Sequence, residues 1–146
     1  MKKQPPLRIP LTRPQHQPSV ISRGQHAEQA ALDYLQRHGL RKVAVNFHCR
    51  MGEIDIIARD AHTLVFIEVR YRKQRRFGGG AMSITRRKQA RIINTAAFYL
   101  QKHGADCECR FDVIEMSPSE QLTVARRSGE QQYHYNWIKD AFSAQA

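Results

Sequence analysis

Residues 52–70, GEIDIIARDAHTLVFIEVR, decide the fold that we expect for this chain. Two apolar, β-branched runs flank the polar segment 60–63, a pattern that predicts two strands joined by a hairpin loop. Each run also contains a carboxylate, Asp55 in the first and Glu68 in the second. Aspartate is depleted inside strands, and a half-buried carboxylate must be hydrogen-bonded, paired or bound to a cation. The two acids are therefore candidate functional residues.

The length of the hairpin loop decides whether these acids lie together. A four-residue loop at 60–63 puts Asp55 opposite Glu68, with Cβ atoms about 5 Å apart. A three-residue loop would pair Asp55 with Ile67 instead and would separate the carboxylates. We expect the four-residue loop. Alternation along the second strand then places Glu68 and Arg70 side by side on one face.

Hydrophobic periodicity predicts the other elements of an α/β domain. They are a helix from Ser22 to Gly39, strands at 42–49, 53–59 and 64–71, a helix capped by Ser83 or Thr85 and ended by Gly104, and a strand at 109–116. One face of the strand at 42–49 is expected to be buried, with Val43, Val45, Phe47 and Cys49. The order helix, three strands, helix, strand results.

The two ends of the chain differ from this pattern. Residues 1–22 hold five of the six prolines, four basic residues and no acid, which predicts a disordered basic, Pro-rich tail. Residues 23–146 are expected to form a single domain. After a polar loop at 117–130, the pattern predicts a short strand at 133–135 and a terminal helix at 137–142.

The charge of the chain favours a polyanionic partner. Lys and Arg number 24 against 13 Asp and Glu, a net charge of +11, and nucleic acid or an anionic membrane face would suit this excess. Basic residues crowd the segment after Glu68 and the first turns of the second helix, where they oppose the helix dipole. The residues expected to contact nucleic acid are Arg72, Lys73, Arg75, Arg76, Arg86 and Arg87. The alternative is a solvated sheet edge protected by charge.

Other classes of protein are excluded or disfavoured. Three cysteines are an odd number without framework spacing, which argues against an oxidised, secreted scaffold. Zinc binding by His103, Cys107 and Cys109 would lack a fourth ligand and a known spacing. No run approaches the roughly 18 apolar residues of a membrane span, and residues 1–22 have no apolar signal core. We expect a cytoplasmic protein with no membrane partner.

A third acid completes a candidate metal site. Glu28 lies at the edge of the buried stripe of the first helix. Clustered carboxylates repel one another and would repel a phosphate, a cost that a divalent cation removes by bridging them. Hard oxygen ligands are what Mg²⁺ or Mn²⁺ prefers. The alternative is that Asp55 and Glu68 form ordinary salt bridges with Arg70 or Arg72.

Five motifs in order carry a resemblance to a known family. They are RGQHAEQAALDYL, GEIDII, FIEVR, TRRKQARIINTAAFYL and RFDVI. Over about residues 22–142 the chain resembles the YraN-like bacterial family, which is grouped with the PD-(D/E)xK nuclease superfamily, close to archaeal Holliday-junction resolvases. The resemblance implies a restriction-endonuclease-like αβββαβ core, with a mixed central sheet flanked by helices.

The resemblance also implies an activity and site residues. It makes Glu28, Asp55 and Glu68 the acids that bind Mg²⁺ or Mn²⁺, and puts Arg70 where the E-x-K signature has lysine. A guanidinium cannot act as a base, so we consider Lys88 as the source of the missing ammonium. The implied function is a metal-dependent endonuclease on branched DNA, with DNA favoured over RNA and with a homodimer by analogy with resolvases. The alternatives are a nucleic-acid-binding module with little catalysis and an adaptor for an acidic protein.

Overall fold

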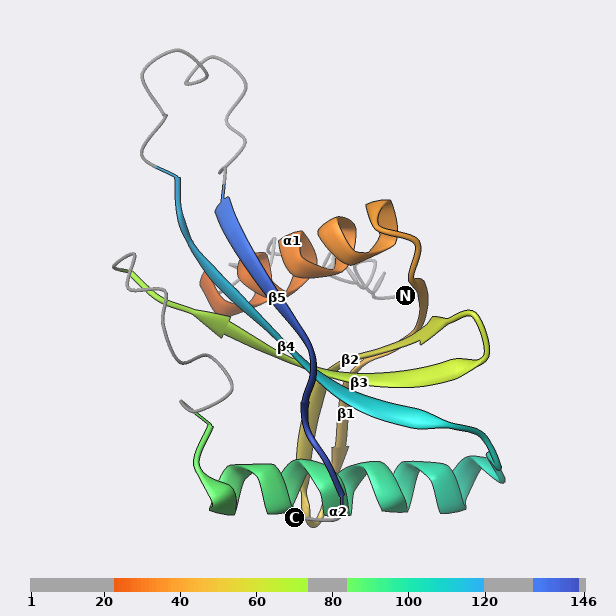
Figure 1. The fold of residues 1–146 in the computed structure, drawn as a ribbon. Helices are drawn as coiled ribbons and strands as arrows, with labels where there is room; N and C mark the ends of the chain where they lie inside the picture. The colour runs from red at the N-terminus through yellow and green to blue at the C-terminus, as the bar shows by residue number, and fades with distance from the viewer. Residues whose placement is uncertain (1–22, 74–83, 120–132, 145–146) are drawn as a thin grey trace, which may run out of the picture.

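The computed structural model describes residues 23–73, 84–119 and 133–144. The elements are α1 (Arg23–Arg37), β1 (Arg41–Cys49), β2 (Gly52–Asp60), β3 (Thr63–Tyr71), α2 (Arg86–His103), β4 (Cys109–Pro118) and β5 (Tyr133–Phe142). The predicted order of helix, three strands, helix and strand is confirmed (Figure 1). The tail predicted at 1–22 lies outside the described residues.

The strands of the described chain form one mixed sheet in the order β1-β2-β3-β4-β5. Strands β3 and β4 are parallel, and the other neighbours are antiparallel. A parallel pair requires a crossover connection, and α2 lies in the segment between β3 and β4. The α/β fold with a mixed sheet flanked by helices is thus confirmed, with α1 and α2 on opposite sides of the sheet (Figure 1).

Each face of the sheet has its own hydrophobic core. The α1-side core contains Ala27, Ala31, Leu32, Leu35, Leu40, Ile56, Ala58, Val65, Ile67, Ile114 and Met116. The α2-side core contains Ile54, Ile57, Leu64, Phe66, Ile92, Ala96, Tyr99 and Phe111. Strand β3 contributes alternate residues to the two cores, so both of its faces are covered.

Both ends of α2 follow from local sequence. The hydroxyl of Thr85 accepts a hydrogen bond from the backbone N–H of Lys88 at 3.2 Å, which caps the first turn. Gly104 ends the helix in the left-handed conformation, with φ of 59°, and its N–H donates to the carbonyl of Gln101. The predicted stop at Gly104 is confirmed, and Thr85 is the cap among the two candidates.

The register of the β2–β3 hairpin agrees with the prediction. Arg59 pairs with Leu64, as a four-residue loop requires. The strands continue further, however, until Asp60 pairs with Thr63, so the turn itself contains only residues 61–62. A two-residue turn and a four-residue loop both have an even number of residues, so the same residues of β2 and β3 stay paired.

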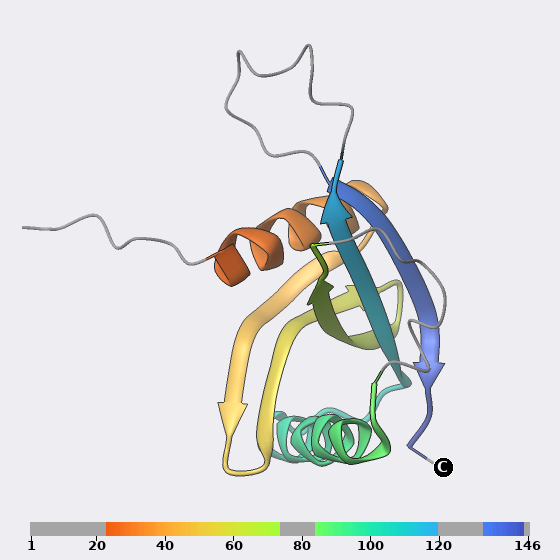
Figure 2. The same cartoon turned by 90° about the vertical axis from the view of Figure 1, so that its left-hand side faces the viewer.

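The sheet forks between β2 and β3. Their pairing ends at Ile56 and Ile67, whereas β2 stays paired with β1 as far as Cys49 and Gly52. The β1–β2 hairpin therefore leaves the sheet, and its tip lies beside α2 (Figure 2). Gly52 allows this approach, because a Cβ there would lie 3.1 Å from Oγ1 of Thr95 on α2. Asp55 and Glu68 lie on the two arms of the fork.

The predicted helix at 137–142 is wrong, because these residues continue β5. Six residues are too few for a stable isolated helix, and as a strand they cover the edge of β4. Side chains reinforce the pairing. The fully buried carboxylate of Asp112 accepts hydrogen bonds from the indole Nε1 of Trp137 and the backbone N–H of Asp140, both at 2.9 Å.

The predicted buried face of β1 is wrong for Val43 and Val45 and is confirmed for Phe47. Val43 and Val45 are 43% and 44% exposed, whereas Ala44 and Phe47 pack on the α2-side core. Strand β1 is an edge of the sheet, and its register shifts between Lys42 and Ala44. Alternation also breaks between Ala44 and Phe47, which pack on the same side although they are three residues apart.

Candidate functional site

Asp55 lies at the point where β2 and β3 separate. Its half-buried carboxylate accepts a hydrogen bond from the backbone N–H of Val69 at 2.8 Å, so a side chain replaces the next bond of the ladder. Burial and the neighbouring carboxylate of Glu68 raise the pKa of Asp55 to about 7, and Glu28 contributes to the rise. The charge of Lys88 and the Val69 hydrogen bond oppose it. The positive charge near Asp55 therefore does not offset the cost of ionising its carboxylate.

Glu68 on β3 is paired with a lysine from α2. Only 6% of Glu68 is exposed, and its Oε1 binds the ammonium of Lys88. Lys88 is in the first turn of α2, at the position whose backbone is fixed by the Thr85 cap. The structure therefore brings together Glu68 and Lys88, which are 20 residues apart in the chain.

A cavity of about 400 Å³ opens beside this pair on the α2 side. It is lined by Glu53, Glu68, Thr85, Arg87, Lys88, Arg91 and Ile92. Two further cationic side chains, Arg87 and Arg91, thus lie around the Glu68–Lys88 ion pair at the fork of the sheet. Such a setting can hold an anionic group such as a phosphate, since Arg and Lys both donate to phosphate oxygens.

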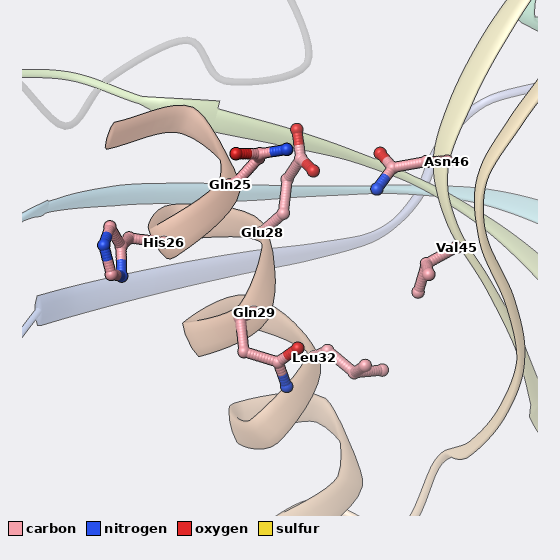
Figure 3. A pocket seen from close by; sticks show the side chains of 7 residues that line it. All are labelled: Gln25, His26, Glu28, Gln29, Leu32, Val45 and Asn46. Carbon is pink, nitrogen blue, oxygen red and sulfur yellow. The ribbon is translucent and has the colours of Figure 1, made fainter. Parts of the chain in front are cut away.

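Glu28 approaches the fork from the other side. It is half-buried on α1 and lines a second cavity of about 340 Å³ with Gln25, His26, Gln29, Leu32, Val45 and Asn46. Figure 3 shows the Glu28 carboxylate and the Asn46 amide directed toward one another from α1 and β1. The predicted acids therefore approach the fork from α1, β2 and β3, and the charges of Glu28 and Glu68 both raise the pKa of Asp55.

The donor set fits a hard divalent cation. In the described ranges, no group of three Asp, Glu, His or Cys side chains is gathered as a ready cation cage. Mg²⁺ commonly uses only one or two carboxylates and completes its shell with waters and phosphates. Asp55 and Glu68 supply such a pair, and the raised pKa of Asp55 indicates a site that additional positive charge would stabilise.

The predicted basic residues are dispersed. Arg70 lies opposite Glu115 in the β3–β4 register, and Nε of Arg72 is 3.7 Å from a carboxylate oxygen of Glu115. Lys73, Arg86 and Arg87 are exposed, and of these Arg87 borders the α2-side cavity. Arg75 and Arg76 lie outside the described residues.

Three residues that border the site are not among the predicted site residues. Arg91 lies one helical turn after Lys88, and its helical spacing was the available signal. Glu53 lies on the arm of β2, at the α2-side cavity, and its carboxylate is 3.4 Å from Nδ1 of His48. Asn46 lies inside β1, and the depletion of asparagine in strands is the sequence signal that marks it.

Neither helix within the described part of the chain is long and apolar enough to cross a membrane. All three cysteines, Cys49, Cys107 and Cys109, are free thiols.

Fold and site together define an α/β protein whose mixed sheet forks at a pair of carboxylates. The chain belongs to the family described as "Uncharacterised protein family UPF0102", whose sequence model matches residues 27–116. The YraN-like resemblance is thereby confirmed at the level of the family.

Relatives cover most of the chain. A UPF0102 protein of Chromohalobacter salexigens is 43% identical over 122 residues, 84% of this chain and 91% of that protein. A UPF0102 protein of Psychromonas ingrahamii is 47% identical, covering 83% and 89%. The UPF0102 protein HEAR0176 of Herminiimonas arsenicoxydans is 39% identical over 140 residues, covering 94% of this chain and 100% of that protein.

Proposed function

We propose that this protein is a divalent-metal-dependent endonuclease of the PD-(D/E)xK type, which hydrolyses phosphodiester bonds in branched DNA. The observation that carries the proposal is the meeting of Asp55, Glu68 and Lys88 at the fork, beside a cavity rimmed by arginines. Two acids and an ammonium next to a phosphate-binding rim suit the in-line attack of water on a phosphodiester.

Asp55 and Glu68, with Glu28, are the residues that would hold Mg²⁺ or Mn²⁺. When bound, the cation would polarise the scissile phosphate and lower the pKa of a bound water. The buried Glu68 already has the charge of Lys88 beside it, whereas the pKa of about 7 leaves Asp55 partly protonated at neutral pH. Ionisation of Asp55 is therefore the step that a bound cation would favour.

Lys88 is proposed to do the work of the E-x-K lysine. The superfamily pattern has lysine where this chain has Arg70, and a guanidinium stays charged and cannot exchange a proton. The ammonium of Lys88 reaches Glu68 from α2 instead. There it can orient the attacking water and stabilise the charge that develops on the phosphate.

The exposed basic residues would hold the DNA backbone. Arg87 and Arg91 border the α2-side cavity, and Arg86 is exposed in the same helical turn as Arg87. Lys73 extends the positive surface from the end of β3. Contacts of this kind bind phosphates without reading sequence, which suits recognition of DNA shape. Symmetric cutting of a junction would further require a homodimer.

Two observations favour a second candidate, a nucleic-acid-binding module with little or no catalysis. Lys88 is already engaged with Glu68, and Arg70 replaces the signature lysine. If the ion pair persists when DNA binds, Lys88 cannot serve the attacking water. The positive rim would then bind DNA without cleavage.

A cleavage assay separates the two candidates. The purified protein is incubated with four-way junction, flap, linear duplex and single-stranded DNA, in Mg²⁺, in Mn²⁺ and in EDTA. The nuclease proposal expects metal-dependent cleavage that Asp55→Asn abolishes and that Asp106→Asn, a substitution at an exposed acid remote from the fork, leaves intact. Cleavage that survives Asp55→Asn would indicate a contaminant. DNA binding without cleavage in either metal would favour the binding module.

A further inference from the structure

Asn46 occupies an irregular position on the edge strand β1. Its φ is 50°, in the left-handed region that residues with a Cβ rarely adopt. The flanking pairs, Val45 with Ile56 and Phe47 with Ile54, place Asn46 directly opposite Asp55. The irregular residue of β1 thus faces the acid at the fork.

Strand β2 is irregular at the same place. Ile54 packs in the α2-side core and Ile56 in the α1-side core, although residues two apart in a regular strand share a face. On β1, Ala44 and Phe47 both pack on the α2-side core although they are three apart. The regular alternation of side chains between the two faces of the sheet is therefore broken on each strand, around the facing positions of Asn46 and Asp55.

This break in alternation brings Asn46 to the cavity that contains Glu28. Asn46 lines this α1-side cavity with Glu28, and the two side chains are directed toward one another (Figure 3). A left-handed non-glycine residue costs about 1 kcal/mol or more, and asparagine tolerates it best. The same conformation places the Asn46 side chain at the cavity that Glu28 lines.

We propose that Asn46 is a further ligand of the cation site, contributing its amide oxygen between Glu28 and Asp55. This inference rests on the proposed metal dependence. Amide oxygens are hard, neutral ligands that complement carboxylates at such cations. A neutral ligand also adds no charge to a site where Glu28 and Glu68 already raise the pKa of Asp55. Asn46 would thus be a fourth, neutral protein ligand beside Glu28, Asp55 and Glu68.

The test is Mn²⁺ binding measured by isothermal titration calorimetry, with Tm measured in EDTA. Asn46→Gly keeps the left-handed backbone and removes the amide, so Mn²⁺ affinity should fall about tenfold or more while Tm stays equal or rises. Asn46→Asp supplies a stronger ligand and should bind Mn²⁺ at least as tightly as wild type. Ala61→Gly is the matched control, because Ala61 also has a positive φ, 52°, at the far end of β2. It should leave Mn²⁺ affinity unchanged.

Four outcomes would overturn the inference. If Asn46→Gly bound Mn²⁺ as tightly as wild type, the amide would not be a ligand. The same conclusion would follow if Asn46→Asp bound Mn²⁺ no better than Asn46→Gly. Weakened binding accompanied by a lower Tm in Asn46→Gly would assign the residue to folding. A wild-type protein that binds no Mn²⁺ would instead refute the proposed metal dependence, and this inference with it.

Discussion

Replacing Asp55 with asparagine should make the protein more stable at alkaline pH. The change keeps the shape of the side chain, and its amide oxygen can still accept the hydrogen bond from Val69 N–H. Burial, followed by the charges of Glu68 and Glu28, raises the pKa of Asp55 from 3.8 to about 7. The folded protein therefore binds more protons than the unfolded chain between these values, so wild-type stability falls as pH rises from about 4 to about 7.

The magnitude follows from the size of the shift. About three pKa units correspond to a ceiling of about 4 kcal/mol, at 1.36 kcal/mol per unit. The carboxylate is only half-buried and interacts with other acids, so screening by solvent reduces the expected effect to about 1–2 kcal/mol. For a chain of this size that corresponds to a Tm difference of several degrees, at about 3–5 °C per kcal/mol.

The assay is urea unfolding of wild type and Asp55→Asn in EDTA, at about pH 4.5 and about pH 8. Subtracting the two proteins removes the contributions of other titrating groups. The advantage of Asp55→Asn should grow by about 1–2 kcal/mol between the two pH values. A difference that is independent of pH would refute the assigned pKa and the electrostatic origin of the site. At the higher pH, Mn²⁺ should stabilise wild type more than Asp55→Asn.

Three further predictions concern α2. Lys88→Ala should lower any cleavage rate about 100-fold or more, with little change in DNA affinity. It should also destabilise the protein by about 1–3 kcal/mol, because Glu68 stays buried without its partner. An unchanged cleavage rate would exclude Lys88 from the chemistry. Replacing both Arg86 and Arg87 with serine should reduce the slope of log K against log salt by about two, measured by fluorescence anisotropy with duplex DNA, whereas an unchanged slope would locate the phosphate contacts elsewhere. Gly104→Ala should lower the unfolding free energy by about 1 kcal/mol, because residues with a Cβ rarely adopt the φ of 59° found here. A Cβ would contact nothing within 4 Å, so no steric clash adds to this cost. A neutral effect in urea unfolding would show that the helix end adjusts.

Local patterns in the sequence determined most of the fold. Hydrophobic periodicity located both helices and the first four strands, because all of these elements except the edge strand β1 bury residues in one or both cores. The stop at Gly104 and the even register of the β2–β3 hairpin depend only on neighbouring residues, so both were predictable. The acids Asp55 and Glu68 could be singled out for the same reason, since carboxylates inside apolar strands conflict with local propensity.

Only the tertiary structure decided how the site is assembled. Residues 137–142 became a strand because the edge of β4 needed a partner, which no local period encodes. The fork arises where β2 stays with β1 and leaves β3, so pairing over long sequence distances determines the setting of Asp55. Lys88 reaches Glu68 through the docking of α2, and a slip in the alternation of two strands brings Asn46 to the cavity that Glu28 also lines. These contacts join segments far apart in the chain, which hydrophobic pattern and local propensity do not specify.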